Sequence, residues 1–345
     1  MPNAVNHSVW IGSVQRHPQC VAEAIEAGLT SVGRLPIRGE RWAVKLNLTY
    51  PTYLPGVVNA PAFVEGFCQW ASDRGVRLIL IEGDGGNGSY SAQDTFDGNG
   101  VSQIAKRYDV RCVSISETPW EWRETRVADK TIRLPYSPFF RRRDFDRFII
   151  APLFKNHIFT TVTLGMKNLW GCIPDAYRMY YHYQLDHGIV ALCKELQPDL
   201  SIFDGLIAMR GRGPMEGQPL DMDAVMVSSN VGCGEFAALE IMGIPIKNVR
   251  HLQIATDEGL LSGRPVTWLT DPTPFKRTDF ILERTLLNHL TIQLCKIPVL
   301  QRVIYHSHLS SAIYAVVNRV RGESAQTKLL KAKWADKYHH IPRND

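Results

Sequence analysis

The stretch DRFIIAPLFKNHIFTTVTLGMKNLWG, residues 146–171, decides the fold. Its apolar run Phe148–Leu153 is typical of a buried strand, and Lys155 and His157 follow this run directly. The threonines and the helical spacing of the polar residues after it predict a helix from Thr160 to Gly171. Because ionisable side chains beside a buried strand are costly unless they are used, we expect the functional site here.

Apolar runs and helical periodicity alternate along the first 270 residues. This order predicts an α/β fold with a mostly parallel sheet and helices on both faces. The expected strands are Trp42–Leu48, Val76–Glu82, Val110–Ser116, Phe148–Leu153, Leu200–Phe203 and Ala224–Ser228. The other expected helices are Cys20–Leu29, Pro61–Arg74, Val101–Tyr108, Met179–Leu196 and Glu235–Met242.

The pattern changes at three places along the chain. The segment Ser89–Asp97 is polar and turn-like, and residues 119–145 form a proline-bearing, arginine-rich stretch that we expect to be an irregular excursion. After about Asp271 the periodicity predicts three long helices. We therefore expect an α/β domain over residues 1–270 and a helical C-terminal extension over 271–345. The three helices are Arg277–Lys296, Pro298–Val320 and Ser324–Tyr338.

Composition narrows the class of protein. The 345 residues are 45% hydrophobic and 21% charged, which is ordinary for a globular protein. No run of about 18 apolar residues and no signal-peptide pattern occurs, so we expect a cytoplasmic protein without an integral membrane segment. Seven scattered cysteines without a CxxC pair argue against a disulfide framework and a cysteine-bound metal or cluster. The net charge is +5, but the chain lacks the combined basic and aromatic pattern of a nucleic-acid-binding module. We therefore expect no nucleic-acid partner.

Polar side chains follow most of the predicted strands at their carboxyl ends. In open α/β sheets ligands bind beyond these ends, and a parallel sheet brings the ends to one edge. We therefore expect a shared site for a small molecule there. The residues concerned are Lys45, Asn47, Glu82, Lys155, His157, Asp204, Arg210, Arg212 and Gly213, with Thr160, Lys167 and Asn168 from the predicted helix.

Lys45, Lys155 and Lys167 are expected to form a cationic pocket that suits a carboxylate or a phosphate. His157 lies beside these cations, so we expect its pKa to be lowered and its ring to act as a neutral base or donor. Two plainer interpretations stay open. Lys45 pairs with a carboxylate, Glu82 or Asp204, or His157 is hydrogen-bonded in a turn.

A metal site is an alternative interpretation of the acidic and histidine residues. His182 and Asp186 are four apart and share a face if they lie on a helix, and His157 or Asp204 completes such a set. We expect no cofactor in the main interpretation, and iron or another divalent metal in this alternative. The sequence GDGGNG after Glu82 matches GxGxxG, but no helix is expected to begin there, which argues against a dinucleotide site.

Several blocks of the chain resemble the DUF362 family, a domain of unknown function, over roughly residues 40–262. They are KxN at Lys45–Asn47, LFKNHIFTTVTLGMKNLWGCIP, PDLSIFDGLIAMRGRGPMEGQP, and EIMG followed by HLQIATDEGL. The resemblance implies an α/β fold and, because some relatives are fused to iron–sulfur modules, hints at redox chemistry. The matched residues are Lys45, Asn47, Lys155, His157, Thr160, Lys167, Asn168, His182, Asp204, Gly211, Gly213, Pro214 and Gly217.

The chain departs from the family pattern in charge. Arg210 and Arg212 stand where relatives usually have acidic and small polar residues, and Asn230 and Glu235 stand where they usually have two aspartates. These changes favour a specialised, stand-alone biosynthetic member over one with an inherited redox role.

Three functions follow as hypotheses. The first is an enzyme on an anionic organic molecule, of proton-transfer, lyase or isomerase type, in which Lys45, Lys155 and Lys167 bind the anion or an oxyanion. His157 then transfers protons, assisted by Asp204 or His182. The second is a metal-dependent oxidoreductase with an external electron donor. The third is non-catalytic binding of lipid or a partner, a peripheral membrane contact, through the basic segment and the C-terminal helices.

Overall fold

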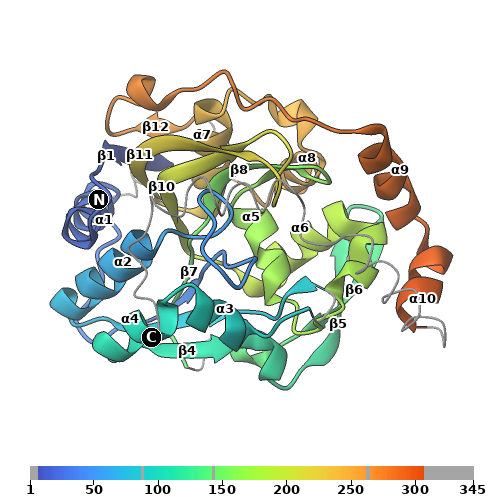
Figure 1. Cartoon of the computed structure of the whole chain (residues 1–345), viewed down its shortest axis with the longest axis horizontal. Helices are drawn as coiled ribbons and strands as arrows, with labels where there is room; N and C mark the ends of the chain where they lie inside the picture. Colours follow the sequence, from blue (N-terminus) through green and yellow to red (C-terminus); the bar gives the residue numbers. More distant parts are fainter. Residues whose placement is uncertain (1–6, 87–88, 142–143, 262–264, 307–345) are drawn as a thin grey trace.

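A large sheet with helices on both faces forms the body of the protein (Figure 1). The computed structural model describes residues 7–86, 89–141, 144–261 and 265–306. In spatial order the main strands are β12 (Thr267–Trp268), β1 (Ser8–Ser13), β11 (Gln218–Ser228), β10 (Leu200–Arg210), β7 (Arg147–Ile150), β2 (Arg41–Lys45), β3 (Arg77–Glu82) and β4 (Arg111–Ser114). β8 (Leu153–His157) pairs with β10 and with β9 (Thr161–Thr163).

The sheet is mostly parallel, as the alternating order of elements predicts. The strands from β10 through β7, β2 and β3 to β4 all run in one direction. Within the described residues of this large sheet, antiparallel pairing is confined to β1 with β11, β10 with β11, and β8 with β9. The carboxyl ends of β2, β3 and β7 therefore lie at one edge, and β8 continues the chain beyond the end of β7.

The two faces of the sheet carry separate hydrophobic cores, because successive side chains of a strand point to opposite faces. Ala43 of β2 lies in one core, and its neighbours Trp42 and Val44 lie in the other. The first core is covered by α5 (Gly165–Asn168), α6 (Leu185–Leu196), α7 (Val231–Ile241) and α8 (Arg250–Asp257). The second is covered by α1 (Pro18–Ser31), α2 (Pro61–Arg74), α3 (Ala92–Gly98) and α4 (Val101–Arg107).

The expected helix Thr160–Gly171 is wrong. The chain forms the β8–β9 hairpin, then the four-residue helix α5, then a short 3₁₀ helix, η4 (Leu169–Cys172). The threonines explain the difference, because β-branched side chains favour strands over helices. Lys155 and His157 consequently lie within β8 and face Thr163 and Thr161 of β9.

Three further segments differ from expectation. The excursion at 119–145 contains an ordered hairpin, β5 (Glu121–Val127) with β6 (Lys130–Tyr136), whose alternate apolar side chains are buried. The turn-like segment after residue 89 contains α3, begun by a capping box between Ser91 and Asp94. His182 lies in a 3₁₀ helix, η5 (Arg178–Gln184), that precedes α6, because the predicted helix begins only at Leu185.

The C-terminal region begins as extended chain on the body. Phe275 and Phe280 are buried in the same core as α6 and α7. Two helices follow, α9 (Leu286–Cys295) and α10 (Pro298–His306), which lie at the outer edge of the molecule, away from α1 and α2 (Figure 1). The remainder of the expected second helix and the whole of the third, Ser324–Tyr338, lie outside the described residues.

Candidate functional site

A buried ion pair lies at the carboxyl edge of the sheet. Lys45, the last residue of β2, donates from Nζ to Glu82 Oε1 at 2.5 Å, and Glu82 ends the neighbouring strand β3. Their side chains are 1% and 5% exposed. Glu82 also accepts the backbone N–H of Leu48 at 2.7 Å and of Gly83 at 3.0 Å. The alternative interpretation of Lys45 as a residue paired with Glu82 is therefore the one that the structure shows.

Lys155 extends the same cluster from β8. Its ammonium donates to the carbonyl oxygen of Val57 at 2.8 Å and to Asn47 Oδ1 at 3.4 Å, and its side chain is fully buried. Burial lowers the pKa of Lys155 to about 7, and the positive charge of Lys167 acts in the same direction. This amine therefore gives up its proton more readily than an exposed lysine does.

His157 points from the same face of β8 as Lys155 because the two residues are two apart on one strand. Its Nδ1 accepts the backbone N–H of Phe159 at 3.1 Å and of Thr160 at 3.4 Å. Burial, together with the charges of Lys167 and Lys155, holds the pKa of His157 well below its usual value, in the expected direction. The ring is neutral, and because Nδ1 is an acceptor, its proton is on Nε2.

Lys167 is the half-buried member of the cluster, from α5. Burial lowers its pKa to about 7, and the charges of Arg178 and Lys45 contribute. Its ammonium lies 6.0 Å from the ring centroid of Trp170, and no hydrogen bond or salt bridge engages it within the described part of the chain. The rings of His157 and His182 both lie against Phe159, with centroids 6.1 and 5.2 Å from that of Phe159.

Asn47, Asn168 and Thr160 support this cluster through hydrogen bonds. Asn168 Oδ1 accepts from Lys45 Nζ at 3.5 Å, and its Nδ2 donates to the Lys45 carbonyl at 3.4 Å. Thr160 donates its hydroxyl to Val162. The Nδ2 of Asn47 is buried without a hydrogen-bond partner. Among these three residues, Asn47 thus has a hydrogen-bond donor, Nδ2, that is unused beside Lys155.

Asp204 of β10 is engaged by N–H donors. Its Oδ2 accepts the backbone N–H of Ala60 at 2.7 Å and Asn59 Nδ2 at 3.2 Å, and Oδ1 accepts the N–H of Leu206 at 3.1 Å. Burial raises the pKa of Asp204 to about 6 even though these bonds lower it. The carboxyl group therefore holds the start of α2 against the sheet, and Asn59 connects it to the backbone N–H of Asn47 at 2.6 Å.

Arg210, Arg212 and Gly213 lie in and after the end of β10. Arg210 forms an ion pair with Asp279, and Arg212 forms one with Glu216 at 2.9 Å. Gly213 packs on the hairpin, where a Cβ would lie 1.8 Å from the carbonyl oxygen of Asn156. Both arginines are thus neutralised by carboxylates, and the glycine permits close approach of the loop to β8.

Glu235 and His251 were not predicted as site residues. Glu235 of α7 is fully buried, accepts the backbone N–H of Met166 at 2.7 Å, and has no hydrogen-bond partner at Oε2. Burial raises its pKa to about 8. His251 of α8 is fully buried with no hydrogen bond at either ring nitrogen, and burial with the charge of Lys167 lowers its pKa to about 3. A carboxylate among the small and apolar residues of VGCGEFAA, residues 231–238, was the available signal for Glu235.

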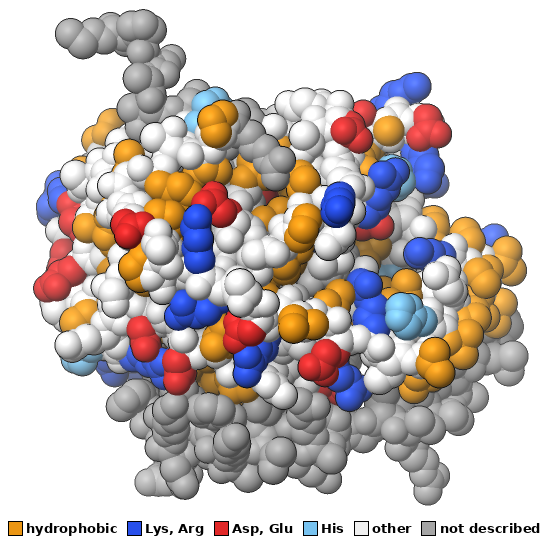
Figure 2. Space-filling model, turned by 90° about the horizontal axis from the view of Figure 1, so that it is seen from above, with side chains coloured by type: hydrophobic (Ala, Val, Ile, Leu, Met, Phe, Trp, Pro, Cys, Tyr) orange, Lys and Arg blue, Asp and Glu red, His pale blue; other side chains and the backbone are white. Residues whose placement is uncertain are grey.

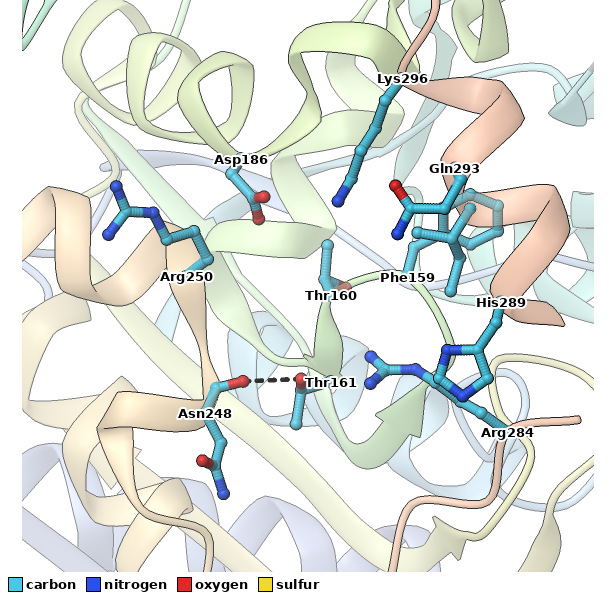
Figure 3. Close-up of a pocket in the computed structure, with 11 residues that line it drawn as sticks. Phe159, Thr160, Thr161, Asp186, Asn248, Arg250, Arg284, His289, Gln293 and Lys296 are labelled. Atoms are coloured by element: carbon cyan, nitrogen blue, oxygen red, sulfur yellow. Dashed lines mark hydrogen bonds between the residues drawn. The ribbon is translucent and has the colours of Figure 1, made fainter. Parts of the chain in front are cut away.

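A pocket of about 310 Å³ lies beside the hairpin turn Phe159–Thr161 (Figure 3). Asp186 of α6 lines it, 3.9 Å from Nδ1 of His251. No group of three or more His, Cys, Asp or Glu side chains suited to a metal ion occurs within the described ranges. The alternative metal set of His157, His182, Asp186 and Asp204 therefore stays a hypothesis.

The comparisons with known proteins place the chain in a family. Residues 43–240 match the sequence profile of "Domain of unknown function (DUF362)". The chain belongs to this family. It is also 27% identical over 224 residues to the thylakoid-associated protein sll1697 of a Synechocystis strain. That match covers 62% of this chain and 66% of the relative, slightly less than two thirds of its length. No solved structure matches the chain significantly.

The family match covers the strands that carry Lys45, Glu82, Lys155, His157 and Asp204 and ends near the close of α7. The pocket residues contributed by α8 and α9 lie beyond it. Within the residues that the structure describes, no helix is both long and apolar enough to cross a membrane.

Proposed function

We propose that this member of the DUF362 family is an enzyme that moves a proton on an anionic organic substrate at the Lys155–His157–Lys167 cluster. The observation that carries the proposal is the burial of Lys155 and His157 on one face of β8, where Nδ1 of His157 accepts a backbone N–H. Burial there lowers the pKa values of Lys155 and Lys167 and keeps His157 neutral. General acid–base catalysis works best when the pKa of the catalytic group is close to the working pH. Burial of a lysine without a carboxylate partner lowers the stability of the fold, so such a lysine is a candidate for a functional role.

Each side chain has a distinct role in the proposal. The half-buried Lys167 takes or returns the proton, because its amine is close to half neutral at pH 7 and is free of hydrogen bonds and salt bridges among the described residues. His157 donates Nε2–H to the developing oxyanion, because its Nδ1 is already an acceptor. Lys155 supplies positive charge to a carboxylate or phosphate. The buried pair Lys45–Glu82 and the carboxyl of Asp204 position these groups.

Isotope exchange tests the proposal without knowledge of the product. We expect the protein to catalyse exchange of carbon-bound hydrogen in D₂O for some member of a panel of carboxylate and phosphate metabolites, followed by NMR. Lys167→Met and His157→Gln should each lose about 10²–10⁴-fold of that rate. Lys106→Met, an exposed lysine of α4, is the matched control and should retain it. Full exchange activity in both site variants contradicts the proposal.

A second candidate function is attachment to a membrane surface, which we infer from the outward face of α9 and α10. Figure 2 shows hydrophobic side chains gathered at the edge of the molecule where these helices lie. Monomeric proteins rarely expose apolar patches of this kind without using them. The name of the relative as a thylakoid-associated protein supports the same inference. The residues of this leucine face are Leu286, Leu287, Leu290, Leu294, Ile297, Val299 and Val303, each at least 41% exposed.

Vesicle binding separates this candidate from the enzymatic one. We expect the full chain to sediment with phosphatidylglycerol vesicles and less with phosphatidylcholine vesicles, because exposed Lys296 and Arg302 lie on the same segment. Leu287→Ser with Leu290→Ser should reduce binding, whereas Ile37→Ser, an isolated exposed apolar residue at 74%, should not. Equal sedimentation of all three proteins rules the leucine face out as the membrane contact.

A further inference from the structure

The side of the helix α9 that borders the pocket is mostly polar. His289, Ile292 and Gln293, together with Lys296 just after the helix, line the pocket beside the turn Phe159–Thr161. Surface helices normally turn their apolar stripe inward and their polar residues toward water. The inverted arrangement places these polar groups around a hollow, while none of the residues of α9 is buried.

Hydrogen-bond donors converge on this hollow. Arg284 donates from Nε to the carbonyl oxygen of Ile158 at 2.6 Å, which fixes its guanidinium and leaves the terminal nitrogens toward the pocket. Figure 3 shows the Lys296 ammonium and the Gln293 amide directed toward the same space. Within the described residues, no hydrogen bond or salt bridge engages the side chains of Lys296, His289 or Gln293. Such unused donors are the groups that an anion requires.

The opposite wall of the pocket provides an acceptor. The carboxyl group of Asp186 is partly exposed there, and burial raises its pKa while the charges of Lys296 and Arg250 oppose the shift. Behind it, His251 is fully buried with no hydrogen bond at either ring nitrogen. The pocket therefore has cationic donors on the α9 side and a single carboxylate on the α6 side.

The wall between these groups is a constrained turn. Thr161 has a φ of 70°, which a β-branched residue rarely adopts, and its hydroxyl donates to the carbonyl oxygen of Asn248 at 2.7 Å. Such strain persists only where the surroundings fix the backbone, and it is common at ligand sites. The same turn supplies the N–H groups of Phe159 and Thr160 to His157 Nδ1. The pocket and the catalytic cluster thus share one short segment.

We propose that the α9 pocket binds a phosphorylated small molecule. Its phosphate lies between Arg284 and Lys296, because a guanidinium and an ammonium bind phosphate oxygens strongly. A hydroxyl or amine of the ligand donates to Asp186. The volume of about 310 Å³ suits a ligand of sugar-phosphate size. This inference goes beyond the proposed function and does not depend on it, because neither Lys167 nor His157 lines the pocket.

Calorimetric titration of the full chain tests the binding, with inorganic phosphate, ribose 5-phosphate and ribose as probes. We expect ribose 5-phosphate to bind with a Kd of roughly 10–1,000 μM, inorganic phosphate to bind more weakly, and ribose not to bind. Lys296→Gln and Arg284→Gln should each weaken both anions at least tenfold. Asp186→Asn should weaken ribose 5-phosphate but leave inorganic phosphate unchanged.

Control variants make the outcome decisive. Lys106→Gln removes an exposed lysine of α4 that does not line the pocket, and its affinities should equal those of wild type. Arg284 also bonds to Ile158, so Arg284→Gln could lower the melting temperature. In that case the result for Lys296→Gln is the one that tests the proposal. Binding of ribose as tight as that of ribose 5-phosphate, no binding of either anion at 10 mM, or wild-type affinity in Lys296→Gln overturns the proposal.

The two proposals fail in distinguishable ways. The variants Lys167→Met and His157→Gln should still bind ribose 5-phosphate, because neither side chain lines the pocket. If ribose 5-phosphate binds but no compound of the panel exchanges hydrogen, the catalytic role is rejected and the proposed phosphate site stands. If Lys296→Gln keeps both hydrogen exchange and wild-type affinity for ribose 5-phosphate, the phosphate site is rejected and the proposed catalytic role stands.

Discussion

Glu235 Oε1 accepts the backbone N–H of Met166 at 2.7 Å, a bond that joins α7 to the start of α5. The same carboxyl group also accepts the N–H of Gly165, where a Cβ would lie 2.8 Å from Oε1. The next residue after Met166 is Lys167. The position of this lysine therefore depends on a carboxyl group that the chain supplies nearly seventy residues later.

The first prediction concerns the proton on Glu235. Its pKa is raised from 4.5 to about 8 by burial, so between these pH values the folded protein holds a proton that the unfolded chain has lost. The free energy of unfolding should therefore fall as pH rises through this window, by up to about 1.4 kcal/mol per unit. Glu235→Gln keeps an acceptor for Met166 and should remove this slope in urea unfolding at pH 5, 6, 7 and 8.

The exposed Glu23 of α1 provides the control for that experiment. Glu23→Gln should unfold with the same pH dependence as wild type, because no burial accompanies its charge. If Glu235→Gln retains the full wild-type slope, the carboxyl group is not the origin of the pH dependence.

The second prediction concerns Lys155, whose pKa falls from 10.5 to about 7. Between these values the unfolded chain binds a proton that the folded protein does not, so stability should rise with pH, again by up to about 1.4 kcal/mol per unit. Lys155→Met should reduce this rise in urea unfolding between pH 7 and pH 10, and the part that remains comes from Lys167, whose pKa is lowered to the same extent. Lys106→Met removes an exposed lysine and should leave the rise intact. An unchanged slope in Lys155→Met would mean that Lys155 is not neutral in the folded protein.

The third prediction concerns the close approach of Gly213 to β8. A Cβ there would lie 1.8 Å from the carbonyl oxygen of Asn156, and the Gly213 carbonyl accepts the N–H of Ile158 at 2.9 Å. Gly213→Ala should therefore cost about 1–3 kcal/mol of stability through displacement of the loop. Gly86→Ala, whose Cβ meets nothing nearer than 3.7 Å, should cost less than about 1 kcal/mol. Equal thermal unfolding of the two variants would contradict the packing argument.

The gathering of cations was predictable from the sequence because a parallel sheet leaves little choice. Lys45 and Glu82 end neighbouring parallel strands, and β8 begins just past the end of the strand beside Lys45. Any polar residue at such a position must lie at the same edge, whatever its local propensity. The lowered pKa of His157 was predicted from the neighbouring cations, although burial is its main cause and the charges of Lys167 and Lys155 come second.

The local structure of the site was not predictable in the same way. The spacing of Thr160, Lys167 and Gly171 fits a helix, but pairing with β8 decides the conformation of the threonines, and pairing is a long-range property. Glu235 bonds to backbone N–H groups, which leave no mark on the sequence. The two faces of α9 are visible in the sequence, but the direction in which each face points is not.

The last prediction concerns the buried pair Lys45–Glu82. Removal of one partner leaves a buried charge uncompensated, which typically costs about 3–5 kcal/mol, whereas removal of both costs less than the sum. Lys45→Met and Glu82→Gln should therefore each destabilise strongly, and the double variant should show a coupling energy of at least about 2 kcal/mol in urea unfolding at pH 7. The more exposed pair Arg107–Glu65, at 54% and 22%, is the control, and its coupling should stay below about 1 kcal/mol. Additive losses at Lys45 and Glu82 would show that the pair does not position the site as a unit.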